Sequence, residues 1–342
     1  MKGFLKEEER KIKVSCASLD QWAMDFEGNR RRVVESLKRG ESQGVNIMVF
    51  PELTFCGASC GDHFLEEDTY NHCWEILGEL LYMEEVKKMM CVFGLPARHK
   101  HQLYNCAVLC FKGKVVMIRP KMRLNDQGNS SESRYFKAWE PEMKEELFEF
   151  PKGCFQMEPC KIGNLGVKFK DTCIVFESLS ELTSIAASTE LMEARGAEII
   201  INQSCSYFEF GTYSRRAEIM KNATLKGGGL YLYSNQFGCD GGGLYFDGGS
   251  LIALNGQILA LSPQTSFLEK EMVTAVIDLE QISRFRNFHA EQIYSKEKTL
   301  PAIEISEKIS ITPYSPCITS PIPLPKPLSI PEEIGRLCSH YL

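Results

Sequence analysis

Three positions that directly follow predicted strands could together perform nucleophilic chemistry on an amide. Glu52 follows the apolar run VNIMVFP, Lys121 follows VVMIRP, and position 179 follows TCIVFES. A glutamate carboxylate takes the proton of a thiol, the thiolate attacks an amide carbon, and a lysine ammonium stabilises the charge that develops on oxygen. Each charged residue alone is more often a solvated loop residue, so the hypothesis requires all three to meet at one sheet edge.

The third of these positions holds no nucleophile. Residue 179 is a leucine, which neither donates a proton nor attacks. Cys173 is about 20 Å away along an extended chain, and we expect the flanking Ser178 and Ser180 to point away from the two charged residues. Loss of the nucleophile commonly reduces the turnover of a hydrolase by ~10⁴–10⁶. We therefore predict that Leu179 fills a retired active site, where the two charged residues neutralise each other.

The elements that would position these residues alternate between strands and helices, which is typical of a layered α/β domain. The strands are expected at 12–18, 45–50, 90–95, 172–176, 198–202, 231–235 and 272–279, with hairpins over 107–118 and 244–261. The helices are expected at 29–43, around 74–81, near 181–195 and near 212–226. Because open α/β sheets gather their ligands at the carboxyl ends of the strands, this pattern places the three positions at one edge.

Composition and charge exclude several classes of protein. The 342 residues are 44% hydrophobic and 25% charged, which is the range of globular proteins. A net charge of -6 is too mild for a nucleic-acid binder. No apolar run reaches the roughly 18 residues of a membrane span, and the N-terminus lacks the apolar core of a signal peptide. We therefore expect a cytoplasmic protein that binds neither nucleic acid nor membrane.

The cysteines and glycines give no sign of a metal or cofactor. Fourteen cysteines are scattered without paired Cys-x2-Cys units, so we expect reduced thiols and no metal. The nearest approach to ligand spacing is Cys56, Cys60, His63, His72 and Cys73. The glycine clusters at 227–229, 241–243 and 248–249 match no phosphate-loop pattern. We interpret them as turns and predict no cofactor.

The composition changes after about residue 300. Seven prolines lie between residues 312 and 333, so this segment is expected to run extended as polyproline II or a surface strap. We predict a domain over 1–300 and an extended Pro-rich C-terminal arm over 301–342. The preferred interpretation is an arm that docks on its own domain or on a neighbour. A PxxP ligand for an SH3-like partner is the alternative.

Short sequence motifs, in order along nearly the whole chain, resemble those of a known family. They are QWAMDFEGN (21–29), PELTFCGASCGDHF (51–64), LYNCAVL (103–109), IRPKMRLNDQGNSSESRYF (118–136), DTCIVFESLSEL (171–182), EIIINQS (198–204) and LYLYSNQFGCDGGGLYFDG (230–248). The chain resembles the carbon-nitrogen hydrolase (nitrilase) superfamily, and within it the N-terminal glutaminase domain of glutamine-dependent NAD synthetase. The resemblance implies a four-layer αββα sandwich. No S-G-G-x-D-S loop for ATP occurs, so it also implies that the synthetase half is absent.

Carried over residue by residue, the resemblance assigns the general base to Glu52, the oxyanion-stabilising cation to Lys121 and the nucleophile position to Leu179. An aromatic residue is replaced by Ala58, an acid by Gln127, and a tyrosine that helps hold glutamine by Ser130. Of the two acidic residues that follow the nucleophile, the first is replaced and the second is kept. The predicted remnants of the substrate pocket are Ala58, Gln127, Ser130, Ser180, Glu181 and Ser204.

These observations favour a pseudoenzyme. We predict an inactive nitrilase-like protein that serves as a structural or interaction subunit of a homo-oligomer or larger assembly. One alternative is an amidase or glutaminase that releases ammonia, either with an unrecognised nucleophile or for a separate synthetase subunit. Another is a regulatory protein that binds glutamine without cleaving it. The sequence identifies no specific partner.

Overall fold

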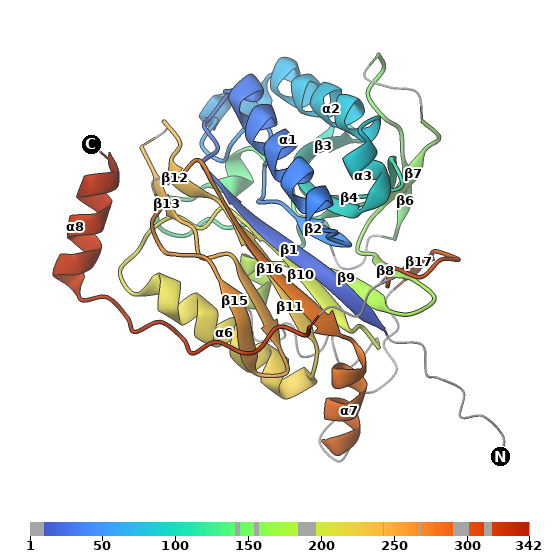
Figure 1. The fold of residues 1–342 in the computed structure, drawn as a ribbon. Helices are drawn as coiled ribbons and strands as arrows, with labels where there is room; N and C mark the ends of the chain where they lie inside the picture. The colour runs from blue at the N-terminus through green and yellow to red at the C-terminus, as the bar shows by residue number, and fades with distance from the viewer. Residues whose placement is uncertain are drawn as a thin grey trace, which may run out of the picture.

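The protein folds as a sandwich of two large sheets between two layers of helices (Figure 1). The computed structural model describes residues 10–140, 144–153, 157–183, 196–241, 243–266, 268–289, 301–310 and 317–341. Helices α1 (Phe26–Ser42), α2 (Glu67–Leu81) and α3 (Glu84–Lys88) cover the outer face of one sheet, and α6 (Thr212–Gly227) covers the other. The predicted αββα fold is confirmed.

The first sheet has eight strands and carries both charged residues of the predicted site. Its order is β16 (Lys270–Asp278), β1 (Lys11–Leu19), β2 (Ile47–Val49), β3 (Met90–His99), β4 (Gln102–Phe111), β5 (Lys114–Pro120), β7 (Cys160–Ile162) and β6 (Glu146–Phe148). Strands β1, β2 and β3 are parallel, so their carboxyl ends share one edge. Glu52 follows β2 and Lys121 follows β5.

The second sheet has seven strands and carries the position where the nucleophile is missing. Its order is β15 (Gln257–Leu261), β14 (Leu251–Leu254), β11 (Leu230–Asn235), β10 (Ile199–Ser204), β9 (Cys173–Ser178), β8 (Gly166–Lys168) and β17 (Ala302–Glu304). Strands β9, β10 and β11 are parallel neighbours. A short hairpin of β12 (Phe237–Cys239) and β13 (Tyr245–Asp247) lies apart from both sheets in the hydrogen-bonding pattern.

The facing surfaces of the two sheets form one apolar core. Buried Val14 and Val49 of the first sheet belong to the same cluster as Ile174 and Ile201 of the second. The opposite faces are also buried, as Phe50 packs with helices α1 and α2 and Tyr231 with α6. Since these strands are covered on both faces, they appear in the sequence as continuous apolar runs rather than alternating ones.

Several elements differ from the sequence-based expectation. The helix expected near 181–195 begins as α4 (Leu179–Leu182), and residues 184–195 lie outside the described residues. The sequence did not indicate α7 (Glu280–Phe288), α8 (Ile330–Tyr341), or the 3₁₀ turns η1 (Gly61–Leu65) and η2 (Glu132–Arg134). The prediction of an extended chain to residue 333 is wrong for its last part. Helix α8 begins at Ile330, where the Ser329 amide donates to Glu332 Oε2 at 2.8 Å.

The part of the arm before α8 lies against the second sheet and the edge of the first. The Thr319 amide donates to the carbonyl of Val276 on β16, and the Ile322 amide donates to that of Ile258 on β15. Within the described ranges, no helix is both long enough and apolar enough to cross a membrane.

Candidate functional site

Glu52 and Lys121 meet in a buried charged cluster at the edge of the first sheet. Their side chains are joined by an ion pair of 2.6 Å between Lys121 Nζ and Glu52 Oε1. Glu132, at the start of η2, adds a second carboxylate, whose Oε1 lies 2.8 Å from Lys121 Nζ. Glu52 is 6% exposed and Lys121 is 8% exposed. Two carboxylates therefore share one ammonium that is largely shielded from solvent.

Neutral hydrogen-bond donors also contact the two carboxylates. Asn105, on β4, donates from Nδ2 to Glu52 Oε1 and to Glu132 Oε1. The backbone amide of Asn125 donates to Glu132 Oε2 at 2.6 Å. The sequence analysis missed Glu132 and Asn105. Both lie in the sequence motifs that carried the resemblance, and Asn105 is on the strand next to β5. Their positions relative to Lys121 could therefore have indicated a place in the site.

Burial and the neighbouring charges together set the direction of the pKa shifts of Glu52 and Lys121. Burial raises the pKa of Glu52, Lys121 offsets this only in part, and Glu132 adds to it. Burial lowers the pKa of Lys121, but Glu52 and Glu132 outweigh it, so the net shift is upward. Lys121 is therefore a permanent cation, whereas Glu52 is a more basic carboxylate than an ordinary glutamate.

The turn that presents Glu52 is held tightly against β3. Leu53 has a φ of 49°, a left-handed conformation that residues with a side chain rarely adopt. The Thr54 amide donates to the carbonyl of Gly94 at 2.8 Å, and the Gly94 amide donates to Thr54 Oγ1 at 3.1 Å. A Cβ at Gly94 would lie 2.6 Å from Glu52 Cα, so only glycine permits this approach.

The elbow after β9 is built as the resemblance implies, but Leu179 stands at its tip. Ser178 caps α4, and Glu181 completes a capping box with the Ser178 backbone. Glu181 Oε1 also accepts from Arg119 Nη1 at 2.8 Å and from the Met122 amide at 2.6 Å. Glu181 does not line the cleft, contrary to the prediction. It links the elbow to the chain after β5.

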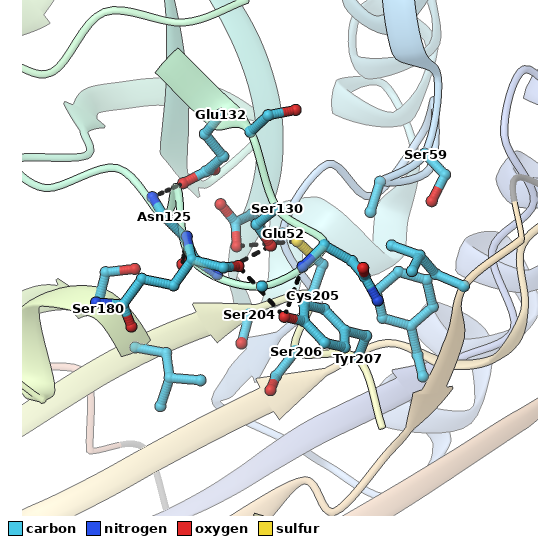
Figure 2. A pocket seen from close by; sticks show the side chains of 18 of the residues that line it. Glu52, Ser59, Asn125, Ser130, Glu132, Ser180, Ser204, Cys205, Ser206 and Tyr207 are labelled. Atoms are coloured by element: carbon cyan, nitrogen blue, oxygen red, sulfur yellow. Dashed lines mark hydrogen bonds between the residues drawn. The ribbon is translucent and has the colours of Figure 1, made fainter. Parts of the chain in front are cut away.

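A cleft of about 640 Å³ opens above the charged cluster. Its walls include the predicted pocket residues Ala58, Gln127, Ser130, Ser180 and Ser204. Ser180 was expected to point away from the charged residues, yet it lies in this wall (Figure 2). Leu179 packs partly against the buried cluster of β9, β10 and α6. It forms part of the wall, and the prediction that it fills the site is wrong because the cleft is open.

The floor of this cleft holds a thiol that the sequence analysis missed. Cys205, directly after β10, donates from Sγ to Glu52 Oε2 at 3.3 Å (Figure 2). The side chain is partly exposed and lines the cleft. Glu52 therefore contacts the ammonium through one oxygen and a thiol through the other.

The remaining cysteines and histidines do not form a metal site in the described part of the chain. No group of three or more histidine, cysteine, aspartate and glutamate side chains has the arrangement needed to hold a metal ion there. The thiols of Cys56 and Cys60 instead donate to backbone carbonyls. No disulfide joins the cysteines of the described residues.

The chain is similar to eukaryotic glutamine-dependent NAD(+) synthetases. It is 37% identical to the Drosophila melanogaster enzyme over 96% of this chain and 43% of that protein. It is 38% identical to the Saccharomyces cerevisiae enzyme over 80% of this chain and 39% of that protein. The predicted relation to these synthetases is confirmed. The chain spans about two fifths of the length of these curated relatives.

Solved structures and a family match agree with this relation. A glutamine-dependent NAD(+) synthetase from Cytophaga hutchinsonii is 26% identical, covers 78% of this chain and 43% of its own, and has a TM-score of 0.67. An amidase from Nesterenkonia sp. AN1 covers 86% of this chain and all of its own with a TM-score of 0.62, and at 15% identity shows the fold alone. Residues 13–287 match the carbon-nitrogen hydrolase family. The chain belongs to the carbon-nitrogen hydrolases.

Proposed function

We propose that this protein hydrolyses a small carboxamide and releases ammonia, which is the alternative that the sequence analysis kept open. The observation that carries the proposal is the buried Glu52, Lys121 and Glu132 cluster beneath an open cleft. The curated relatives are glutamine-dependent enzymes. A base and a permanent cation at the floor of a cleft are the groups that amide hydrolysis requires.

An inert scaffold has no physical need for this cluster. A buried ion pair is at best weakly stabilising, and its replacement by apolar residues of similar volume is often neutral or favourable. Here three charged side chains, one neutral donor and the left-handed Leu53 are arranged beneath a cleft wide enough for a small molecule. Such arrangements are typical of sites where strain and burial serve chemistry.

The rim of the cleft favours an amino-acid amide as the substrate. Exposed Glu209 and Arg215 both line it, at the entrance to and first turn of α6. A free amino acid carries an ammonium and a carboxylate on one carbon, and these two rim residues offer one charge of each sign. Glutamine is therefore the first substrate to test.

We expect the protein to release ammonia from glutamine faster than its Glu52→Gln variant does, because the variant lacks the base. Ammonia is measured with a coupled assay, with asparagine and propionamide as competing substrates and reductant throughout. Leu179→Cys is the positive control, since it restores a thiol at the position that the resemblance assigns to the nucleophile. Equal rates for the natural chain and Glu52→Gln on every carboxamide contradict the proposal.

A second candidate function is that of a docking subunit, in a homo-oligomer or with a separately encoded synthetase. It is favoured by α8, whose Ile330 and Ile334 are 58% and 45% exposed. These side chains are four residues apart and so share one helix face. An exposed apolar face at the end of an arm is a common means of association.

If this face is used, the double variant Ile330→Asp and Ile334→Asp shifts the mass of the protein in solution to that of one chain. The measurement is light scattering after size-exclusion chromatography. The matched control is Arg336→Glu, which changes charge on the same helix and keeps both the isoleucines and the hydrogen bond between Ser329 and Glu332. A natural chain that is already monomeric removes the support for self-association.

We further propose that the protein works in the cytoplasm. The cysteines of the described segments form no disulfide with one another, which suits a reducing compartment.

A further inference from the structure

We infer that Cys205 is the nucleophile of this site, in place of the residue lost at position 179. The inference rests on the proposed function, because it names the group that attacks the carboxamide. Four independent features carry it: the contact with Glu52, the position of Cys205 in the second sheet, the hydrogen bonds that hold its turn, and the electrostatics of the thiol.

The contact with Glu52 is the one that a nucleophile and its base require. The Cys205 thiol donates to Glu52 Oε2 at 3.3 Å, while Lys121 occupies Oε1 of the same carboxylate. Figure 2 shows the sulfur directed at this carboxylate from the floor of the cleft. The thiol, the base and the cation are thus consecutive in one hydrogen-bonded chain, and all three line the cleft.

The register of the second sheet places Cys205 close to the lost position. Strands β9 and β10 are parallel, and Gln203 pairs with Ser178. Leu179 is the first residue after β9 and Cys205 is the first residue after β10, so both positions lie just past the ends of neighbouring strands. Neighbouring strands are ~4.8 Å apart. A thiol at Cys205 therefore approaches the same base from the adjacent strand end.

Hydrogen bonds on both sides fix the turn that carries the thiol. The Glu52 amide donates to the carbonyl of Ser204 at 3.3 Å, which ties the backbone of the base to the residue before the thiol. The Ser206 amide donates to Asn235 Oδ1 at 2.8 Å, and Arg216 Nη1 donates to Ser206 Oγ at 3.0 Å. The residues before and after Cys205 are both anchored, as a catalytic group requires.

The electrostatics of the thiol fit a base-assisted nucleophile. Burial raises the pKa of Cys205 well above its ordinary value, and Glu52 adds to this, whereas Lys121 lowers it. The resting group is therefore the thiol, and it needs a base. Burial also raises the pKa of Cys56 and Cys91, but these thiols donate to backbone carbonyls, which cannot take a proton. Cys205 differs from them in having a carboxylate as its acceptor.

These groups account for every bond in the reaction. The Cys205 proton moves to Glu52 as sulfur bonds to the carboxamide carbon, and the carbonyl electron pair moves to oxygen beside the Lys121 ammonium. Collapse of this adduct breaks the C–N bond, and Glu52 gives its proton to the departing nitrogen, which leaves as ammonia. Water then loses a proton to Glu52 and attacks the thioester. The C–S bond breaks, sulfur regains the proton, and the carboxylic acid is released.

The test uses 6-diazo-5-oxo-L-norleucine, a glutamine analogue in which a diazoketone replaces the amide. Sulfur bonds to the diazo carbon, the thiol proton moves to that carbon, and dinitrogen leaves. We expect one adduct per chain on the peptide that contains Cys205, with saturation kinetics and protection by glutamine. Mass spectrometry of the intact chain measures the number of adducts and the rate of labelling, and mass spectrometry of its peptides identifies the labelled cysteine. Labelling that is directed to other cysteines, or that glutamine does not slow, overturns the assignment.

The variants separate this inference from the proposed function. Cys205→Ala is expected to lose both the adduct and ammonia release, whereas the control Cys239→Ala, at another partly exposed cysteine, keeps both. Ammonia release that persists in Cys205→Ala overturns Cys205 as nucleophile and leaves the proposed hydrolysis standing. If glutamine protects Cys205 from the adduct but no carboxamide releases ammonia, the proposed hydrolysis is overturned and Cys205 remains the nucleophilic group of the site. Should Cys205→Ala melt at a lower temperature, Cys205→Ser retains the hydrogen bond to Glu52 and is also expected to be inactive, since a hydroxyl is the weaker acid.

Discussion

Replacing Lys121 by methionine is expected to lower the free energy of unfolding by about 3–5 kcal/mol, which is the usual effect of removing one partner from a buried ion pair. Methionine has a similar length, so the loss comes from charge rather than from volume. The ammonium is the cation between Glu52 and Glu132. Without it, two carboxylates that already share the Asn105 amide face each other in a dry site.

The pH dependence of this loss gives a sharper test than its size. In Lys121→Met the two carboxylates lose the cation between them and repel each other, so the pKa of Glu52, which is already raised in the natural chain, rises further above its unfolded value. A group with a raised folded pKa stabilises the fold at low pH and loses that contribution as the pH rises. The difference in the free energy of unfolding between the natural chain and Lys121→Met should therefore grow between pH 5 and pH 8.

Urea unfolding followed by circular dichroism across this pH range measures the effect. The matched control is Lys161→Met, which removes a half-exposed lysine 3.6 Å from Glu145. Pairs of this kind contribute about 0–1 kcal/mol, so the control should change little. Two results contradict the description of a buried, negatively charged cluster. One is a loss of unfolding free energy in Lys121→Met that is no larger than in the control, and the other is a loss that does not change with pH.

Replacing Glu52 by glutamine is expected to change two rates in opposite directions. Ammonia release should fall by ~10²–10⁴, the usual contribution of a general base. Alkylation of Cys205 by iodoacetamide at neutral pH should become faster. Glu52 raises the pKa of the thiol and Lys121 lowers it, so removing the carboxylate charge increases the thiolate fraction.

Local unfolding around the site would also lower ammonia release and expose the thiol, so the two rates identify the base when Glu52→Gln melts at the same temperature as the natural chain. In the natural chain, ammonia release should fall on acidification at a pH above the ordinary range of glutamate, because the pKa of Glu52 is raised and its proton-accepting form is lost first. The control Glu218→Gln changes a surface carboxylate on α6 that pairs with Lys221. Unchanged turnover in Glu52→Gln removes Glu52 from the mechanism.

Much of the fold followed from local patterns in the sequence. Apolar runs bounded by turns marked the central strands, and the residues directly after β2 and β5 marked the charged pair. These signals are local because a strand buried on both faces must be apolar along its length. The short strands β6, β7, β8 and β17 have no such run, and their positions depend on pairing with neighbours.

The nucleophile of the proposed site could not be found from spacing alone. Glu52 and Cys205 are far apart in sequence, and only the face-to-face packing of two sheets joins them. The reasoning that identified Glu52, a polar residue directly after a buried strand, applies equally to Cys205 after β10. Leu179 packs toward the hydrophobic cluster beneath it, which a sequence pattern does not reveal.

The parallel pairing of β9 with β10 also limits which thiols this site tolerates. Positions 179 and 205 directly follow neighbouring strands that are ~4.8 Å apart, so a cysteine at position 179 would place a second thiol near Cys205. Oxidation would then join them and consume both. The two positions are accordingly alternatives in an oxidising environment, and a chain with both cysteines depends on reductant for its activity.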